Sequence, residues 1–172
     1  MKSLVDHLSQ YAAYHRDPRN IASHFIGIPL IVVAVAVLLS RPQWAGGWVS
    51  PAVLVALASA WFYLRLELRL GVLMTVLLGL CIRAGQVLAQ QSTLVWLASG
   101  IGMFVVGWAI QFVGHHYEGR KPAFVDDVTG LIVGPLFVVV ELAFLLGLRH
   151  DLKEQIEARV GGVRINPNRA AI

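Results

Sequence analysis

Long apolar runs, separated by short polar breaks, constrain the fold of this 172-residue chain more than any other feature. A helix of nineteen residues is roughly 28 Å long, which is close to the thickness of the hydrocarbon core of a bilayer. Only 14% of the residues are charged and 57% are hydrophobic, whereas a globular protein has roughly 25% charged residues. The sequence therefore predicts an all-α integral membrane protein, a helical bundle whose apolar runs cover about residues 21–39, 51–64, 70–88, 94–113 and 128–148.

The polar stretch 65–69, which contains two arginines and a glutamate, leaves the number of spans open. The runs on either side of it are either two spans or a re-entrant hairpin of short helices, so we expect four or five membrane-embedded helices. Apolar side chains at helical spacing predict a short amphipathic helix over residues 2–14, and a second terminal helix is expected from 149 to about 160. We expect residues 1–160 to form a single helical membrane domain and residues 161–172 to form a flexible tail.

Two polar segments, 14–24 and 111–124, hold four of the six histidines, and each adjoins an apolar run. Four spans between the two segments return the chain to the same face of the membrane. Basic residues near the N-terminus, in 65–69 and in 119–121 are typical of cytoplasmic loops, although a fifth span would put the basic C-terminal tail on the outer side. We therefore expect both histidine clusters on the cytoplasmic side, in the inner or plasma membrane of a bacterium or in the endoplasmic reticulum of a eukaryote.

The net charge of +4 does not indicate nucleic acid as a partner, because the basic residues are scattered and form no basic face with interleaved aromatic residues. Basic residues that flank apolar helices more simply meet anionic lipid headgroups. The single cysteine, Cys81, excludes an intramolecular disulfide and a cysteine-based metal site. Metal chemistry in this chain would need histidine.

The clustered histidines are candidate metal ligands, because neutral imidazole suits iron, zinc and copper. Ionisable side chains at or inside the ends of spans are costly and usually face a functional interior. Taken singly, a histidine at a membrane interface also fits a purely structural role. We predict a metal site drawn from His15, His24, His115 and His116, which either Glu118 or Asp17 can complete.

Three further residues of the second segment are candidate catalytic residues: Glu118, Arg120 and Lys121. Glu118 lies three positions after His115 and can share its helical face, whereas His115 and His116 can both bind one metal only from a turn. Arg120 and Lys121 either hold a carboxylate or a phosphate or contact lipid headgroups.

The two segments resemble the small membrane proteins related to the yeast 2-hydroxy fatty acid dioxygenase. The resemblance spans roughly residues 1–150. It rests on Tyr11-(x3)-His15-(x4)-Asn20-(x3)-His24-(x2)-Gly27-Ile28-Pro29-Leu30 and on Gln111-Phe112-(x)-Gly114-His115 followed by Glu118-(x3)-Pro122-Ala123.

This resemblance implies an Fe(II)-dependent enzyme whose essential histidines correspond to His15, His24 and His115, with His116 kept as an alternative to His115. The implied reaction is α-oxidation, in which a 2-hydroxy fatty acid and O2 give the fatty acid one carbon shorter, CO2 and water. The reaction needs no reductant and no nucleotide, and the sequence has no glycine-rich phosphate loop. The oligomeric state stays open.

Two other classes of function fit the same residues. A haem-binding electron carrier would use His24 and either His115 or His116 as axial ligands between helices. A non-catalytic scaffold or lipid-binding membrane protein would use the polar clusters only to tie helix ends together. Bound haem would favour the first class, and the absence of both metal and O2 consumption would favour the second.

Overall fold

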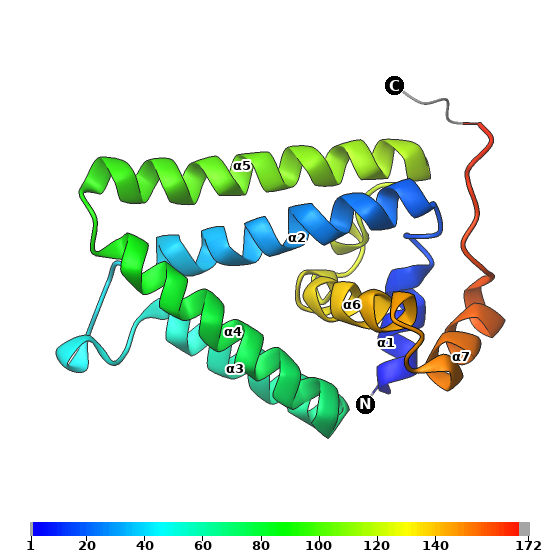
Figure 1. Ribbon diagram of the computed structural model, residues 1–172, viewed down its shortest axis with the longest axis horizontal. Coiled ribbons are helices and arrows are strands. Elements are labelled where there is room, and N and C mark those ends of the chain that lie inside the picture. The colour runs from blue at the N-terminus through cyan, green and yellow to red at the C-terminus, as the bar shows by residue number, and fades with distance from the viewer. Residues whose placement is uncertain (1, 169–172) are drawn as a thin grey trace. The chain divides into compact units, whose positions relative to one another are not determined.

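The computed structural model describes residues 2–168, and the secondary-structure elements in that range are helices (Figure 1). No strand occurs in it, although Trp44 and Val49 form an isolated bridge. The all-α prediction is confirmed. Two short 3-10 turns, η1 (Ala45–Gly47) and η2 (Ala123–Val125), accompany seven α-helices: α1 (Leu4–Ala12), α2 (Pro18–Leu39), α3 (Pro51–Leu66), α4 (Leu68–Ala89), α5 (Thr93–Glu118), α6 (Gly130–Leu145) and α7 (His150–Val160).

The chain divides into two compact units. The first is made of residues 1–28 and 109–172, and the second of residues 29–108. Helices α2 and α5 each contribute residues to both units. The expected single domain over residues 1–160 stays a prediction.

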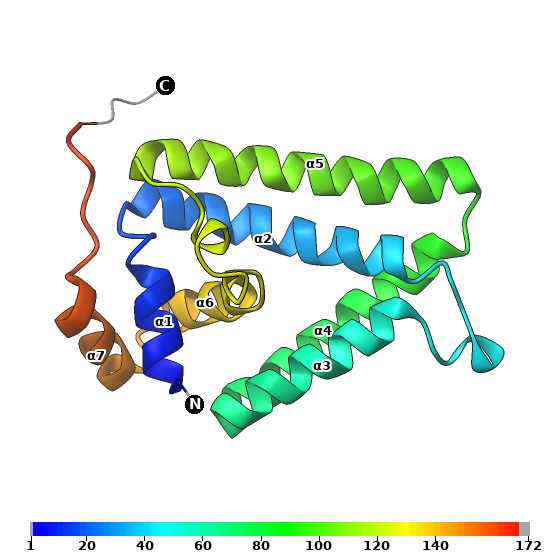
Figure 2. The ribbon, with the colours of Figure 1, turned by 180° about the vertical axis from the view of Figure 1, so that it is seen from behind.

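In the second unit, α3 and α4 lie side by side as an antiparallel pair (Figures 1 and 2). A single extended residue, Glu67, separates them, with φ −161° and ψ 131°. The chain can turn this tightly because Gly71 has no side chain: a Cβ there would lie 2.6 Å from the Cα of Leu64. The polar stretch 65–69, which interrupts the apolar runs in the sequence, therefore contains the tight turn of a helical hairpin.

Within the same unit, polar contacts join the end of α2 to the beginning of α5 and the loop after α2 to the end of α4. The indole N–H of Trp96 donates a hydrogen bond to the carbonyl oxygen of Val37 at 2.9 Å. Arg41 donates to the carbonyl oxygen of Ala89 at 3.0 Å, so it satisfies a helix C-terminus that has no intrahelical partner.

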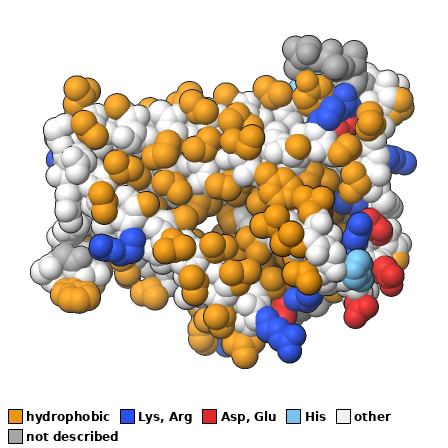
Figure 3. All heavy atoms as spheres, in the orientation of Figure 1, with side chains coloured by type: hydrophobic (Ala, Val, Ile, Leu, Met, Phe, Trp, Pro, Cys, Tyr) orange, Lys and Arg blue, Asp and Glu red, His pale blue; other side chains and the backbone are white. Residues whose placement is uncertain are grey.

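Three helices, α2, α4 and α5, are individually long and apolar enough to cross a membrane. A fourth span results if α6 and α7 count as one, although they are bent by 115°. Helix α3 is apolar but has 16 residues, so it reaches only about 24 Å. Among the four or five membrane-embedded helices that were expected, α3 is thus a short helix and α6 ends at the bend. On the face shown in Figure 3, hydrophobic side chains cover much of the surface and charged ones gather mainly beside α7.

The first unit has a core formed by α1, α6 and α7. Helix α1 begins with a capping box, in which the Ser3 hydroxyl accepts from the Asp6 amide and the Asp6 carboxylate accepts from the Ser3 amide. Its apolar stripe is buried, as the expected amphipathic pattern requires. Pro18 begins α2 and so ends the turn that follows α1. The largest fully buried apolar side chains here are Leu8, Leu136, Phe137 and Val140.

After α7 the described part of the C-terminal segment runs beside the loop between α1 and α2. The amide of Arg164 donates to the carbonyl oxygen of Arg16 at 2.8 Å. The amide of Asn166 donates to the Asp17 carboxylate at 2.8 Å, and its side chain donates to the carbonyl oxygen of Glu118 at 3.0 Å. The flexibility expected of residues 161–172 stays a prediction.

Candidate metal centre

Three histidines from separate parts of the chain meet inside the first unit. His15 lies in the loop after α1, His24 in α2 and His115 in the last turn of α5. Their side chains are 0%, 1% and 6% exposed. One ligand atom from each lies within 4.8 Å of the other two, a spacing that can hold a metal ion. The ring centroids are 4.4 Å apart for His15 and His24, and 5.0 and 5.2 Å from each of these to His115.

The backbone fixes the orientation of two of these rings. Nδ1 of His15 lies 2.7 Å from the carbonyl oxygen of Tyr11, and Nδ1 of His24 lies 2.8 Å from that of Asn20. A carbonyl oxygen only accepts, so each Nδ1 carries a proton and each Nε2 of the neutral ring presents a lone pair. Metal-binding histidines almost always use their second ring nitrogen in this way.

Two buried ring nitrogens of the histidine group show whether a metal ion fits this site. Nε2 of His15 and Nδ1 of His115 are both buried, and neither has a hydrogen-bond partner among the described residues. Leaving such groups unpaired costs about 1–3 kcal/mol each. A metal ion bound by the three imidazoles removes this cost, so the residues present fit a metal.

Burial also sets the protonation state of His15. Desolvation lowers the pKa of His15 well below its usual 6.5, and the neighbouring His24 lowers it further. The ring is therefore neutral at neutral pH, which is the form that binds a metal.

Two aromatic rings cover the centre. Tyr11 stacks on His15 with ring centroids 4.1 Å apart and an interplanar angle of 5°. Phe137 of α6 lies 4.9 Å from the Tyr11 ring and 5.5 Å from the His15 ring. Because both residues are buried, water is excluded from this side of the histidine group.

Glu118 has a different environment from that of a metal ligand. Its carboxylate accepts from the amide of Arg16 at 2.9 and 3.0 Å, from the amide of Asp17 at 2.8 Å and from the side chain of Asn20 at 3.1 Å. These contacts tie the end of α5 to the loop that carries His15 and to the first turn of α2. They are the contacts of a positioning residue, and the catalytic role expected of Glu118 stays a prediction.

Close packing of α5 on α2 brings His115 to the other two histidines. A Cβ on Gly114 would meet the Ser23 hydroxyl and would lie 2.6 Å from Oδ1 of Asn20. One turn earlier on α5, Gln111 is 5% exposed. Its Oε1 and Oδ1 of Asn20 have no hydrogen-bond partner among the described residues, so the region around the histidines holds further unpaired polar atoms.

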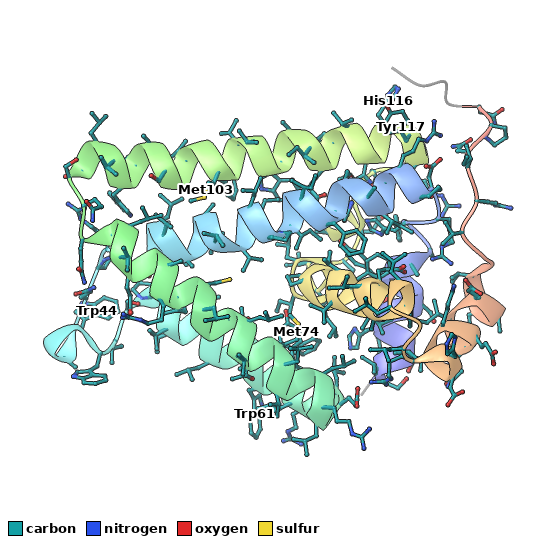
Figure 4. The ribbon with its side chains drawn as sticks, viewed as in Figure 1. Trp44, Trp61, Met74, Met103, His116 and Tyr117 are labelled. Carbon is teal, nitrogen blue, oxygen red and sulfur yellow. The ribbon has the colours of Figure 1, made fainter. Side chains whose placement is uncertain are left out.

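Other residues expected at the site lie outside the histidine group. His116 is exposed and packs against Tyr117, and Figure 4 shows it on the outer side of α5. Arg120 is exposed and donates to the carbonyl oxygen of Ala13 at 2.8 Å. Lys121 forms an ion pair with Asp126 at 2.5 Å.

Asp17, the other carboxylate considered as a ligand, is buried and paired with Arg19 at 2.8 Å. The hydrogen bond from Arg19 lowers the pKa of Asp17 to about 2. The structure therefore brings together three of the four expected histidines, without His116 and without either carboxylate.

Sequence analysis missed the contribution of Phe137 and Arg16. Phe137 is one of many apolar residues in its run, and nothing in the local pattern separates it from the others. Arg16 follows His15 directly and is only 8% exposed, but its burial depends on contacts with α6, α7 and the C-terminal segment.

Comparison with known proteins gives two matches to this chain. The model of a family described as 2-hydroxy-palmitic acid dioxygenase Mpo1-like matches residues 1–146. The chain is also 35% identical over 161 residues to the 2-hydroxy-palmitic acid dioxygenase MPO1 of Saccharomyces cerevisiae, covering 91% of this chain and 90% of the yeast protein. No solved structure matches it.

Proposed function

The chain belongs to the Mpo1-like family of 2-hydroxy-palmitic acid dioxygenases, and from that premise we propose that it is a membrane-bound, Fe(II)-dependent dioxygenase of 2-hydroxy fatty acids. In the proposed reaction, a 2-hydroxy acid and O2 give the acid one carbon shorter, CO2 and water. The C1–C2 bond breaks, the substrate loses four electrons and O2 accepts them, so no further reductant is needed.

The observation that carries the proposal is the group of three buried histidines with unpaired ring nitrogens. Zinc has no redox chemistry, whereas a redox-active metal can bind O2 and pass electrons to it. Iron suits imidazole ligands and can keep positions open for other ligands. Bound Fe(II) would supply the binding and reduction of O2 that side chains cannot supply.

The remaining residues hold this centre in place. His15 and His24 would each present Nε2, because their Nδ1 protons are fixed by carbonyl oxygens. Tyr11 and Phe137 would keep water from the reacting atoms. Glu118 would keep the His15 loop against the end of α5.

A membrane setting suits this substrate. Long-chain 2-hydroxy acids partition into lipid, and the long apolar helices support a place in the bilayer. We place the histidine group on the cytoplasmic side, in the plasma or inner membrane of a bacterium or in the endoplasmic reticulum of a eukaryote.

The number of histidines favours this function over the two alternatives. A haem needs at most two axial histidines, whereas three imidazoles converge here. A scaffold would leave buried ring nitrogens unpaired without compensation, which native structures rarely do.

The test is O2 uptake by anaerobically purified protein reconstituted with Fe(II), with 2-hydroxypalmitate as substrate and palmitate as the control. We expect uptake with the 2-hydroxy acid only, and a product one carbon shorter by mass spectrometry. Firmly bound iron without uptake would refute the proposed reaction, and absence of bound metal would refute the metal centre.

A further inference from the structure

A cavity of about 420 Å³ lies in the unit formed by residues 1–28 and 109–172. The beginning of α2, the end of α6, α7 and the segment after α7 line it. Pockets for small molecules have volumes of about 300–1,000 Å³ and mostly apolar walls. The walls here are also mainly apolar, with side chains from Ile21, Ala22, Phe25, Phe144, Ile156 and Val163.

Charged groups of both signs also line the cavity. Arg16 is 8% exposed, and its guanidinium donates to the carbonyl oxygens of His15 at 3.1 Å and Gly161 at 2.5 Å. Glu141 also lines the cavity and lies close enough to Arg16 and Lys153 to interact with their charges. Lys153 lies at the rim, with its side chain 46% exposed. The cavity is therefore amphipathic and offers both donors and acceptors.

Residues close in the chain to the candidate metal centre line the cavity. Arg16, which lines it, follows His15 in the chain. On α6, the ring of Phe137 lies 5.5 Å from that of His15, and Glu141 is one helical turn further along the same face. A ligand in the cavity would thus have one end beside the histidines.

We propose that this cavity binds the substrate of the proposed function, a long-chain 2-hydroxy acid. Its hydrocarbon chain lies along the apolar walls, its carboxylate accepts from Arg16, and its 2-hydroxyl donates to Glu141. Guanidinium matches carboxylate geometry better than any other side chain. Arg16 takes the part that sequence analysis expected of Arg120 or Lys121, which are exposed and engaged elsewhere.

Ala22 is the residue that we expect to set the usable length of the cavity. It is exposed and lies on the wall, so a larger side chain can occupy the cavity without disturbing the core. Ala22→Trp fills the cavity from α2, and Val163→Trp fills it from the segment after α7, which has no helical structure. Val113→Trp is the matched control, since Val113 is 47% exposed and does not line the cavity.

The experiment uses the full chain in lipid nanodiscs, stripped of metal with a chelator, and a palmitic acid analogue with a photoreactive diazirine on its chain. After illumination, mass spectrometry maps the labelled peptides. We expect labelling at α2, the end of α6 and α7, and competition by 2-hydroxypalmitate more than by palmitate. Ala22→Trp and Val163→Trp should each reduce labelling several-fold, whereas Val113→Trp should not.

The hydroxyl contact has its own variant. Glu141→Leu should keep the labelling but remove the advantage of 2-hydroxypalmitate over palmitate as competitor. If that advantage persists in Glu141→Leu, the role of Glu141 is refuted. Labelling that is spread evenly over the apolar helices, or that is unchanged in both blocking variants, refutes the cavity as the binding site.

Because binding is measured without metal or turnover, the two proposals can fail separately. Labelling that the blocking variants abolish, without any O2 uptake by the reconstituted protein, supports the cavity and refutes the dioxygenase. Uptake that keeps its rate and its chain-length preference in Ala22→Trp supports the dioxygenase and refutes the cavity.

Discussion

Replacing Gly114 by alanine adds a methyl group at the point where α5 touches α2. The new Cβ would meet the Ser23 hydroxyl and lie 2.6 Å from Oδ1 of Asn20 and 3.0 Å from Cβ of Ser23. The Ser23 hydroxyl already donates to the carbonyl oxygen of Asn20 at 2.7 Å. The clash therefore involves a bonded group, and α5 has to move away from α2.

The expected cost follows from this overpacking. Extra methyl groups in well-packed interiors cost about 1–3 kcal/mol. For a chain of this length each kcal/mol lowers the melting temperature by roughly 2–4 °C, so Gly114→Ala should lower it by roughly 2–12 °C. His115 is the next residue, and displacing a ligand's support typically weakens metal affinity about 10–100-fold.

Gly102→Ala is the control, because it lies in the same helix and a Cβ there meets nothing within 4 Å. In open helical space alanine is favoured over glycine by about 0.8–1 kcal/mol, so this variant should be at least as stable as the parent. The assays are thermal unfolding in nanodiscs and bound metal by mass spectrometry.

Ser23→Gly in the Gly114→Ala chain removes two of the three closest contacts and should restore part of the stability. The reasoning fails if Gly114→Ala and Gly102→Ala have the same melting temperature and the same metal content.

Three further predictions concern the histidine centre. Alanine at His15, His24 or His115 should abolish stoichiometric metal binding, whereas His116→Ala should retain it because His116 is exposed; equal losses in all four variants would contradict this assignment. Glu118→Gln should lower the free energy of unfolding by about 1–3 kcal/mol, because its amide nitrogen would face the backbone N–H groups of Arg16 or Asp17; an unchanged urea midpoint would argue against the positioning role. Burial lowers the pKa of His15 below its usual 6.5, so neutral His15 makes its full contribution to the free energy of unfolding above pH 6.5. That contribution declines as the pH falls below 6.5, because the unfolded chain then binds more protons than the folded chain. Unfolding curves of the metal-free protein from pH 7.5 to 5 should show this decline, and the decline should be smaller in His15→Gln.

Much of the fold follows from local patterns in the sequence. Runs of about twenty apolar residues with few charges form helices because the backbone must satisfy its own hydrogen bonds in lipid. Pro18, at the first position of α2, and the charged stretch around Glu67 mark helix boundaries, and both do so in the structure. The lengths of the helices were harder to predict, since α6 ends at Leu145 and the chain bends by 115° into α7.

The histidine centre shows where sequence patterns stop being sufficient. The sequence identified the two segments, but neighbouring residues in a helix point about 100° apart, so only one of His115 and His116 can face α2. Which one does so depends on how α5 rotates to place Gly114 against Ser23 and Asn20. That rotation is a packing property and has no local signal.

The sequence by itself determined that this chain is an all-α membrane protein with two polar segments rich in histidine, because hydropathy and helical spacing are local properties. Only the tertiary structure decided that His15, His24 and His115 meet, that Glu118 binds backbone amides, and that Arg16 turns into a cavity beside them. These features depend on contacts between residues about one hundred positions apart, which only the packed chain defines.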